Sequence, residues 1–187
     1  MKKVVTTLMC LLVLCIPAHA SFLHELAESA REVQSEVDAL YAEKNITEGN
    51  VSFRLAEGWM TDSSGVIEGT DTVYHVFAND GCSIMFYYDE YNLSNPDLAD
   101  TIILSVTNAI KGSIDVVDEQ TQEVDIANCK GYATSFIYGT DDDLKIEMIT
   151  AFNSGQGIVN IVYNSESLDM PFIDDYVDMV NNITVLE

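Results

Sequence analysis

Three adjacent aspartates, Asp141-Asp142-Asp143, form the densest group of potential metal ligands in the sequence. Carboxylate oxygens are the ligands that Ca²⁺ prefers in proteins, so these residues are a candidate Ca²⁺ site. Asp115, Asp118 and Glu119 form a second acidic group. Neither group has the alternating spacing of a calcium-binding loop. The interpretation we favour is a solvated acidic surface that keeps the protein soluble.

Residues for catalysis are scarce. His24 lies in a predicted helix and His75 in an apolar predicted strand, where a structural role is the default. The sequence has no nucleophile elbow, phosphate-binding glycine loop or zinc-binding His-Glu-x-x-His helix. We therefore assign no catalytic residue, and a hydrolase with an unrecognised site remains an alternative. A ligand groove could be lined by Trp59, Tyr87, Tyr88 and Tyr91, although buried packing is the default for such side chains.

Cys82 and Cys129 each begin a predicted strand, and the other two cysteines lie in the N-terminal apolar run. In an oxidising compartment such an isolated pair predicts one disulfide. By the chain-entropy estimate, that disulfide would stabilise the fold by about 4 kcal/mol. The alternative is two separate buried thiols.

Residues 1–20 predict where the protein works. Lys2 and Lys3 precede an apolar run over residues 4–16, and Ala18-His19-Ala20 offers small residues for cleavage. This pattern is typical of a signal peptide. The run is too short to span a bilayer. We expect a secreted or extracytoplasmic protein, in the periplasm or the cell exterior, with no membrane span.

The charge limits the choice of partners. The formal net charge is −23, and removal of Lys2 and Lys3 would make it more negative by two units. Nucleic acids and anionic membranes would repel such a chain, because both are bound through clustered Lys and Arg. The expected partner is an unknown protein or a small ligand, with no cofactor predicted apart from the Ca²⁺ option.

The next segment, residues 21–44, reads as an amphipathic helix. Its apolar residues are spaced alternately by three and four: Leu23, Leu26, Ala30, Val33, Val37 and Leu40. That spacing is a heptad seam. We expect the seam to pack on the protein's own sheet, and oligomerisation through residues 21–43 is the alternative.

From residue 50 onward, strand patterns alternate with two helices. Asn79-Asp80-Gly81 predicts a tight hairpin turn. Asn95-Pro96 is typical of a helix start and predicts a helix over residues 95–112. Its inward stripe is expected to include Leu98. Pro171 opens a last helix with Tyr176 and Val177 facing inward. Strands are predicted at residues 51–55, 66–68, 72–78, 82–89, 114–117, 122–126, 129–138, 144–153 and 157–163. The predicted fold class is α+β, a single antiparallel sheet with helices on both faces.

Ser52-Phe53-Arg54-Leu55 leading into Gly58-Trp59 resembles the PsbP-like superfamily of exported and lumenal domains. The resemblance covers about residues 50–187 and implies an α/β/α sandwich with a non-enzymatic accessory or binding role. It transfers no site residue. The expected function is that of an exported, acidic, non-catalytic binding or accessory domain, and the alternative is a secreted calcium-dependent interaction module.

Overall fold

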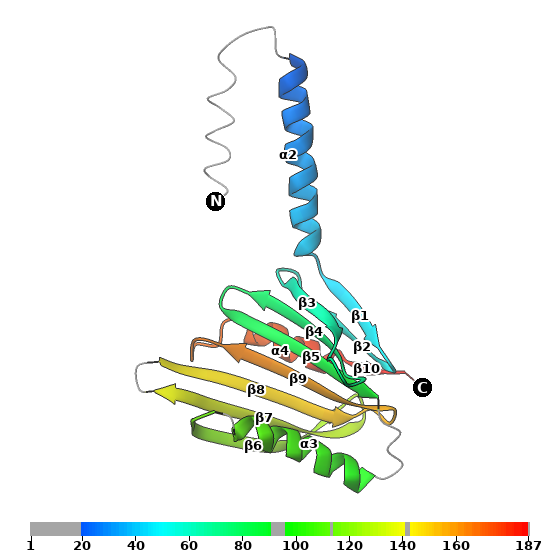
Figure 1. Ribbon diagram of the computed structural model, residues 1–187, viewed down its shortest axis with the longest axis vertical. Helices are drawn as coiled ribbons and strands as arrows, with labels where there is room; N and C mark the ends of the chain where they lie inside the picture. The colour runs from blue at the N-terminus through cyan, green and yellow to red at the C-terminus, as the bar shows by residue number, and fades with distance from the viewer. Residues whose placement is uncertain (1–19, 91–95, 113, 141–142, 187) are drawn as a thin grey trace. The chain divides into compact units, whose positions relative to one another are not determined.

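The protein is described by a computed structural model that covers residues 20–90, 96–112, 114–140 and 143–186 (Figure 1). It contains two compact units, Met1–Ala39 and Leu40–Glu187. We call the second unit the β body. No helix in the described ranges is long and apolar enough to cross a membrane.

α2 (Ala20–Leu40) contains the predicted heptad seam. Every side chain from residue 28 to residue 43 is exposed. The seam residues Val33, Val37 and Leu40 are 56%, 40% and 49% exposed. A heptad seam is narrower than the stripe with which a helix covers a globular core. Packing of the seam on the protein's own sheet stays a prediction.

The main sheet of the β body has seven antiparallel strands in the order β3-β4-β5-β9-β8-β7-β6. Their bounds are β3 (Met60–Val66), β4 (Val73–Asn79), β5 (Cys82–Glu90), β6 (Val116–Ile126), β7 (Cys129–Thr140), β8 (Asp143–Asn153) and β9 (Gly157–Ser165). The two strands predicted at residues 114–117 and 122–126 are one long strand, β6. The predicted hairpin between β4 and β5 is confirmed, with Asp80 and Gly81 both at positive φ, 34° and 79°.

A second sheet corrects the predicted fold class. β1 (Lys44–Glu48), β2 (Val51–Leu55) and β10 (Thr184–Val185) form a three-stranded sheet in the order β1-β2-β10. β2 was predicted as part of a single sheet, and no strand was predicted at β1 or β10. β2 instead packs by its face, and the rings of Phe53 and Phe86 lie 4.5 Å apart. Alternate side chains of β2 are thereby buried, which an edge pairing with the main sheet would not achieve.

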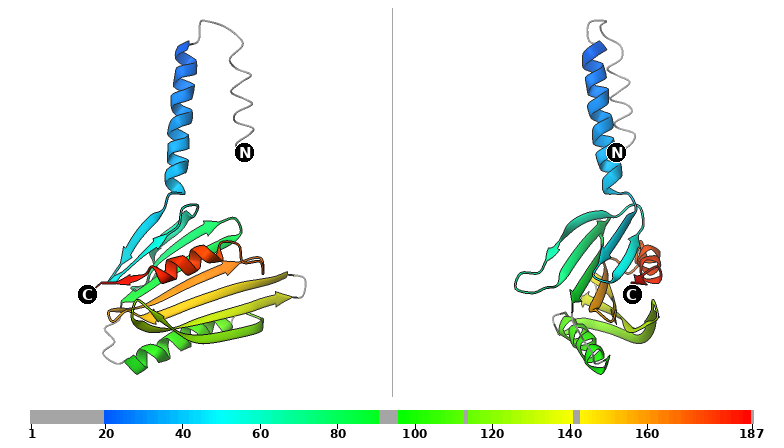
Figure 2. Two further views of the ribbon diagram at one scale, coloured as in Figure 1. Left: turned by 180° about the vertical axis from the view of Figure 1, so that it is seen from behind. Right: turned by 90° about the vertical axis from the view of Figure 1, so that its right-hand side faces the viewer.

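The two faces of the main sheet carry different layers. On one face, the small sheet and α4 (Ile173–Asn181) enclose the largest core cluster, which includes Phe53, Trp59 and Tyr176. On the other face, α3 (Pro96–Lys111) packs on β7 and β8 through Ile103. Figure 2 shows α3 and α4 on opposite sides of the strands. One helix therefore lies on each face, but the predicted single sheet covered by helices is corrected, because a second sheet shares one of those faces.

α3 is rotated slightly from the predicted orientation. In α3, Ala99, Ile103 and Thr107 are buried, whereas Leu98 is 47% exposed. Small Ala99 lets α3 approach the sheet closely, and the Thr107 hydroxyl is satisfied by donating to the Ile103 carbonyl oxygen at 3.2 Å. In α4, Tyr176 is buried as predicted, whereas Val177 is 42% exposed. Residue hydrophobicity alone therefore misplaced the stripe of α3 by about one position and misplaced Val177 in α4.

The two cysteines are free thiols, so the predicted disulfide is not formed. Sheet register gives the reason. Cys82 pairs with Ser165, which continues through Ile146 to Ile137 of β7. Cys129 lies eight residues from Ile137 along β7, about 27 Å at the usual rise, on a strand three positions away. A disulfide needs Cα atoms within about 7 Å.

Candidate functional site

The face that carries α3 is only partly covered. α3 lies over β7 and β8, and no described helix of the β body lies over the adjoining part of β5 and β9 on the same face. The strand register aligns the side chains of this open part in rows. Met85 of β5, Val162 of β9 and Ile149 of β8 form one row, and Tyr87 pairs with Asn160 in another. The uncovered part of the strands and the neighbouring side of α3 together form a shelf on this face.

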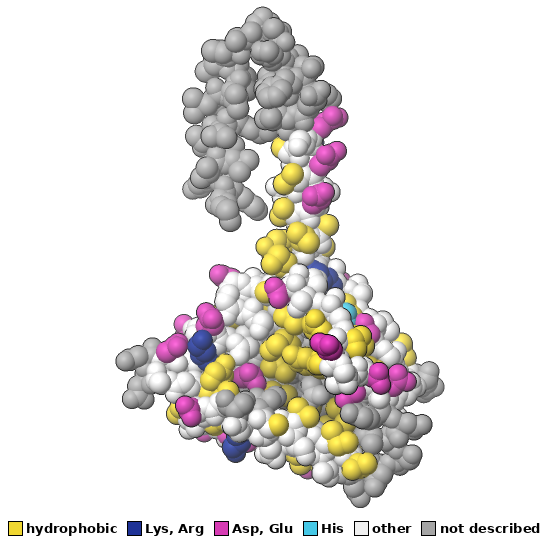
Figure 3. Space-filling view, viewed as in Figure 1, with side chains coloured by type: hydrophobic (Ala, Val, Ile, Leu, Met, Phe, Trp, Pro, Cys, Tyr) yellow, Lys and Arg dark blue, Asp and Glu magenta, His cyan; other side chains and the backbone are white. Residues whose placement is uncertain are grey.

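This shelf forms a groove of about 330 Å³, which we call the α3 groove. Hydrophobic side chains gather in the middle of the same face in Figure 3. The groove is lined by Thr72, Met85, Tyr87, Asp89, Val106, Glu147, Ile149, Asn160 and Val162. A mostly apolar lining with a few polar groups is typical of small-molecule sites.

Asn160 is the unusual residue of the groove. Its neighbours Val159 and Ile161 point into the opposite core, and Ile158 and Val162 share its own face. The Oδ1 atom of Asn160 is buried and has no hydrogen-bond partner in the described part of the chain. Such an atom destabilises a fold by roughly 1–3 kcal/mol when nothing satisfies it. An unsatisfied acceptor beside a groove therefore suggests that a ligand provides the missing donor.

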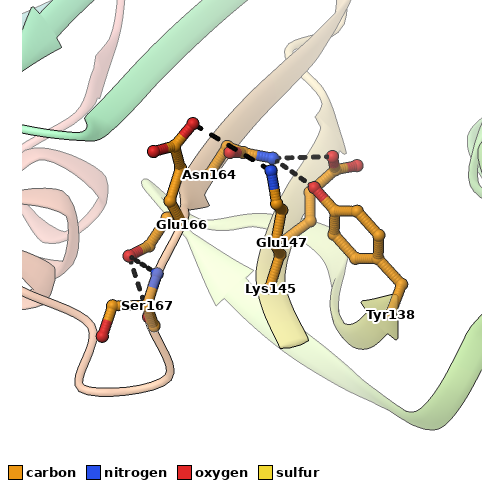
Figure 4. A network of polar contacts seen from close by, with 7 residues as sticks. Tyr138, Lys145, Glu147, Asn164, Glu166 and Ser167 are labelled. Carbon is orange, nitrogen blue, oxygen red and sulfur yellow. Dashed lines mark hydrogen bonds and ion pairs between the residues drawn. The ribbon is translucent and has the colours of Figure 1, made fainter. Parts of the chain in front are cut away.

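Glu147 is the second polar group and is half-buried. Burial raises the pKa of its carboxyl group above the ordinary value of 4.5, and the hydrogen bond from Asn164 opposes that rise. Asn164 Nδ2 donates to Glu147 Oε2 at 3.3 Å and to the Tyr138 hydroxyl oxygen at 2.9 Å (Figure 4). Lys145 on the same strand forms its ion pair with Glu166 instead, at 4.0 Å. The Glu147 carboxylate therefore has one neutral donor and retains acceptor capacity toward the groove.

Tyr87 borders both polar groups. Its hydroxyl donates to Met85 Sδ at 3.4 Å, which is a weak acceptor. The pKa of Tyr87 is raised first by burial, then by the negative charge of Glu147 and by Tyr74. The phenol is therefore neutral, and its hydroxyl oxygen adds a further acceptor to the groove.

The polar groups that line the groove are mainly hydrogen-bond acceptors. Asp89, Glu147, Asn160 and Tyr87 offer acceptor oxygens, and no Lys or Arg is among the lining residues. Among these lining residues, no nucleophile is paired with a base. A group that donates hydrogen bonds, above all a positively charged one, would complement this lining.

The predicted calcium ligands do not contribute to this groove. Asp141 and Asp142 lie outside the described residues, and Asp143 is an exposed residue at the start of β8, paired with Thr140. Within the described ranges, no three His, Cys, Asp or Glu residues are placed to hold a metal ion. In the second acidic group, Glu119 forms an ion pair with Lys111.

His75 lies at the contact between β4 and β1. Its Nε2 lies 2.8 Å from Glu48 Oε1, and its ring stacks on Phe77 with centroids 6.2 Å apart. Ser64 is its register partner on β3, yet among the described contacts His75 has no hydroxyl partner. The His75–Glu48 pair therefore links β4 to β1 and shows no nucleophile.

Sequence reasoning identified one groove residue, Tyr87. Trp59 and Tyr88 are buried at 0% and 4% exposure, and Tyr91 lies outside the described residues. Asn160 and Glu147 were missed. Their signal was present, because each is a polar residue inside an apolar strand, Ile158–Val162 and Ile146–Ile149. Such a position requires either a partner or a function.

Comparison with known proteins shows similarity only at the level of structure. No family model and no curated protein matches the sequence. The solution structure of cyanobacterial PsbP (CyanoP) from Synechocystis, the group that the Gly58-Trp59 segment resembles, has a TM-score of 0.45 and 13% identity. It matches over 76% of this chain and 92% of its own. A crystal structure from Bacteroides thetaiotaomicron has a TM-score of 0.55 and 10% identity, over 77% of this chain and 48% of its own. This chain thus spans about half the length of the Bacteroides protein, and over about three quarters of its own residues it shares that protein's fold.

Proposed function

We propose that this chain is an exported, non-catalytic binding domain and that the α3 groove is its ligand site. The observation that carries the proposal is the buried, unpartnered Oδ1 atom of Asn160 at the wall of an apolar groove. The predicted leader supports export, and the acidic composition suits a protein that must stay soluble outside the cell.

The ligand that fits has an apolar body and a positively charged donor such as an amine. Met85, Val162 and Ile149 would contact the apolar body. The amine would donate to Asn160, and the negative charge of Glu147, four positions farther along the strands, would attract it more strongly in a partly dehydrated site. An anionic ligand would meet acceptors alone, because no basic side chain lines the groove.

The test compares three probes of equal length: hexylamine, hexanol and hexanoate. Any ligand of the folded state raises the melting midpoint. We expect the order hexylamine, then hexanol, then hexanoate, and lengthening the amine should add up to about 0.8 kcal/mol of binding free energy for each buried methylene. A shift for hexanoate as large as that for hexylamine would contradict the charge preference.

A matched pair of variants locates the site. Val106 of α3 lines the groove and is half-buried, whereas Leu104 on the same helix is 36% exposed and lies outside the lining. Val106→Trp should fill the groove and abolish the hexylamine shift, and Leu104→Trp should leave it unchanged. Equal shifts in the two variants would place the binding elsewhere and overturn the proposal.

A further inference from the structure

The seam of α2 is the second feature of the chain with no assigned role. Val33, Val37, Leu40 and the adjoining Tyr41 are exposed large apolar side chains on a regular helix. Singly exposed apolar residues are common, but a row at heptad spacing is the pattern of helices that pair with one another. The charges beside the seam limit which partner α2 can bind.

The flanks of the seam are almost free of charge. With Leu23, Ala30 and Val37 at position a, the flanking e and g positions hold Phe22, Ala27, Ser29, Gln34, Glu36 and Tyr41. Only Glu36 is charged there. The other acidic residues of the helix, Glu25, Glu28, Glu32 and Asp38, occupy the outer positions. Two copies of this acidic helix can therefore meet along the seam without opposing like charges at its edges.

The order of the apolar residues favours opposite directions. In an antiparallel pair the layers are Leu23 with Leu40, Leu26 with Val37, and Ala30 with Val33. Each large residue then meets another apolar residue, and the space beside the small Ala30 is filled by the larger Val33 of the second copy. A parallel pair would instead place Ala30 against Ala30 and leave a gap in the middle of the seam.

Charge favours the same direction. The β body follows the C-terminal end of α2 and holds 26 Asp and Glu against five Lys and Arg, a net charge of −21. Antiparallel helices place the two bodies at opposite ends of a segment of about 30 Å. That distance exceeds the Debye length of about 8 Å at physiological salt, so their repulsion is screened. Parallel helices would bring both bodies to one end.

We propose that α2 binds a second copy of this chain through residues 22–41, as an antiparallel helix pair. The proposal is independent of the α3 groove. It makes the protein a dimer that is joined through α2.

The mass of the protein, as its host exports it, tests the pairing by sedimentation over a concentration series. We expect a dimer that dissociates on dilution. Val33→Asp places a charge in the seam and should give a monomer at every concentration. Ser35→Asp places the same charge on the outer face of the same helix and should remain dimeric. A monomeric wild type, or a Val33→Asp variant that still dimerises, overturns the proposal.

Gln34 tests the direction. In the antiparallel pair residue 34 opposes residue 34 of the second copy, whereas in a parallel pair it opposes Ser29. The local neighbours are balanced, because Arg31 and Asp38 lie three and four positions away. A mixture of Gln34→Lys and Gln34→Glu should therefore form mixed dimers in excess of random pairing, as measured by native mass spectrometry. Random mixing of the two variants overturns the antiparallel arrangement.

Discussion

At the scale of single residues, Asn160 and Glu147 carry the proposed site. Each is a polar group in surroundings that would otherwise favour an apolar side chain. Asn160 Oδ1 has no partner among the described residues, and Glu147 has one neutral donor, Asn164. Proteins keep such groups where function requires them, at some loss of stability.

The loss of stability at Asn160 can be measured. Asn160→Val removes the unsatisfied oxygen and suits a strand, so the free energy of unfolding should rise by about 1 kcal/mol. The hexylamine shift should fall at the same time. Asn164→Val is the matched control on the same strand and face. It removes two hydrogen bonds, to Glu147 and Tyr138, and should destabilise instead. A destabilised Asn160→Val protein would refute our interpretation of the unpartnered oxygen.

Glu147 predicts a pH dependence. Its pKa is raised in the folded protein by burial, so the folded state binds the proton more tightly than the unfolded chain does. Stability from this residue is then fully present below the ordinary pKa of 4.5 and is lost as the pH rises through the folded value. Glu147→Gln should therefore match wild type at about pH 4 and exceed it at about pH 8. Chemical denaturation at the two pH values measures the gap, and a gap independent of pH would argue against a buried carboxylate.

At the scale of elements, α4 shows how a short helix is held in place. It has nine residues, and its N-cap residue Phe172 is left-handed (φ 64°) and makes no side-chain cap. The helix is anchored instead by tertiary contacts. Trp59 Nε1 donates to Asp175 Oδ2 at 2.9 Å, and the Trp59 and Phe172 rings meet edge to face at 6.0 Å. The Gly58-Trp59 segment thus joins the end of β2 to the C-terminal helix.

Two neighbouring aspartates allow the contribution of the Trp59–Asp175 hydrogen bond to be measured apart from that of the helix dipole. Asp174 and Asp175 both lie in the first turn of α4. Either substitution by Ala removes a favourable interaction with the dipole, about 0.3–1 kcal/mol. Asp175→Ala also leaves the buried indole N–H without its partner and should be lower in unfolding free energy by a further 1–3 kcal/mol or so. Thermal or urea unfolding of the two variants gives the difference. Equal values would show that the Trp59 contact contributes nothing.

The outer strand β6 of the main sheet is protected by its composition. The edge strand β6 is eleven residues long and carries Asp118, Glu119, Glu123 and Asp125. Charged side chains along an edge oppose pairing with another chain. The acidic composition therefore has a local use in addition to its effect on solubility, and β6 is not a candidate surface for self-association.

At the scale of the whole molecule, charge repulsion acts on the β body. Sodium chloride should raise its melting midpoint, because screening weakens diffuse repulsion among like charges. Calcium at matched ionic strength should add little, since the described residues hold no metal-binding cluster. A large extra calcium shift that is lost when Asp141, Asp142 and Asp143 are replaced by Asn would restore the calcium alternative.

The sequence by itself determined the local structure and the chemical character of the chain. Two apolar runs and the Asp80-Gly81 turn between them specified β4 and β5, and Pro96 and Pro171 marked the two helix starts of the β body. These signals are local, because they depend on backbone geometry within a few residues. The heptad spacing of α2 was equally plain.

Only the tertiary structure decided which segments meet. Short β1 and β10 become strands only because β2 lies between them. Strand register keeps Cys82 apart from Cys129, and the packing of α3 on the sheet buries Ala99 rather than Leu98. The α3 groove exists because α3 covers only part of one sheet face, which brings Glu147 and Asn160 from separate strands to one wall. Such contacts depend on pairing between distant segments, and the pattern within any single segment does not contain that information.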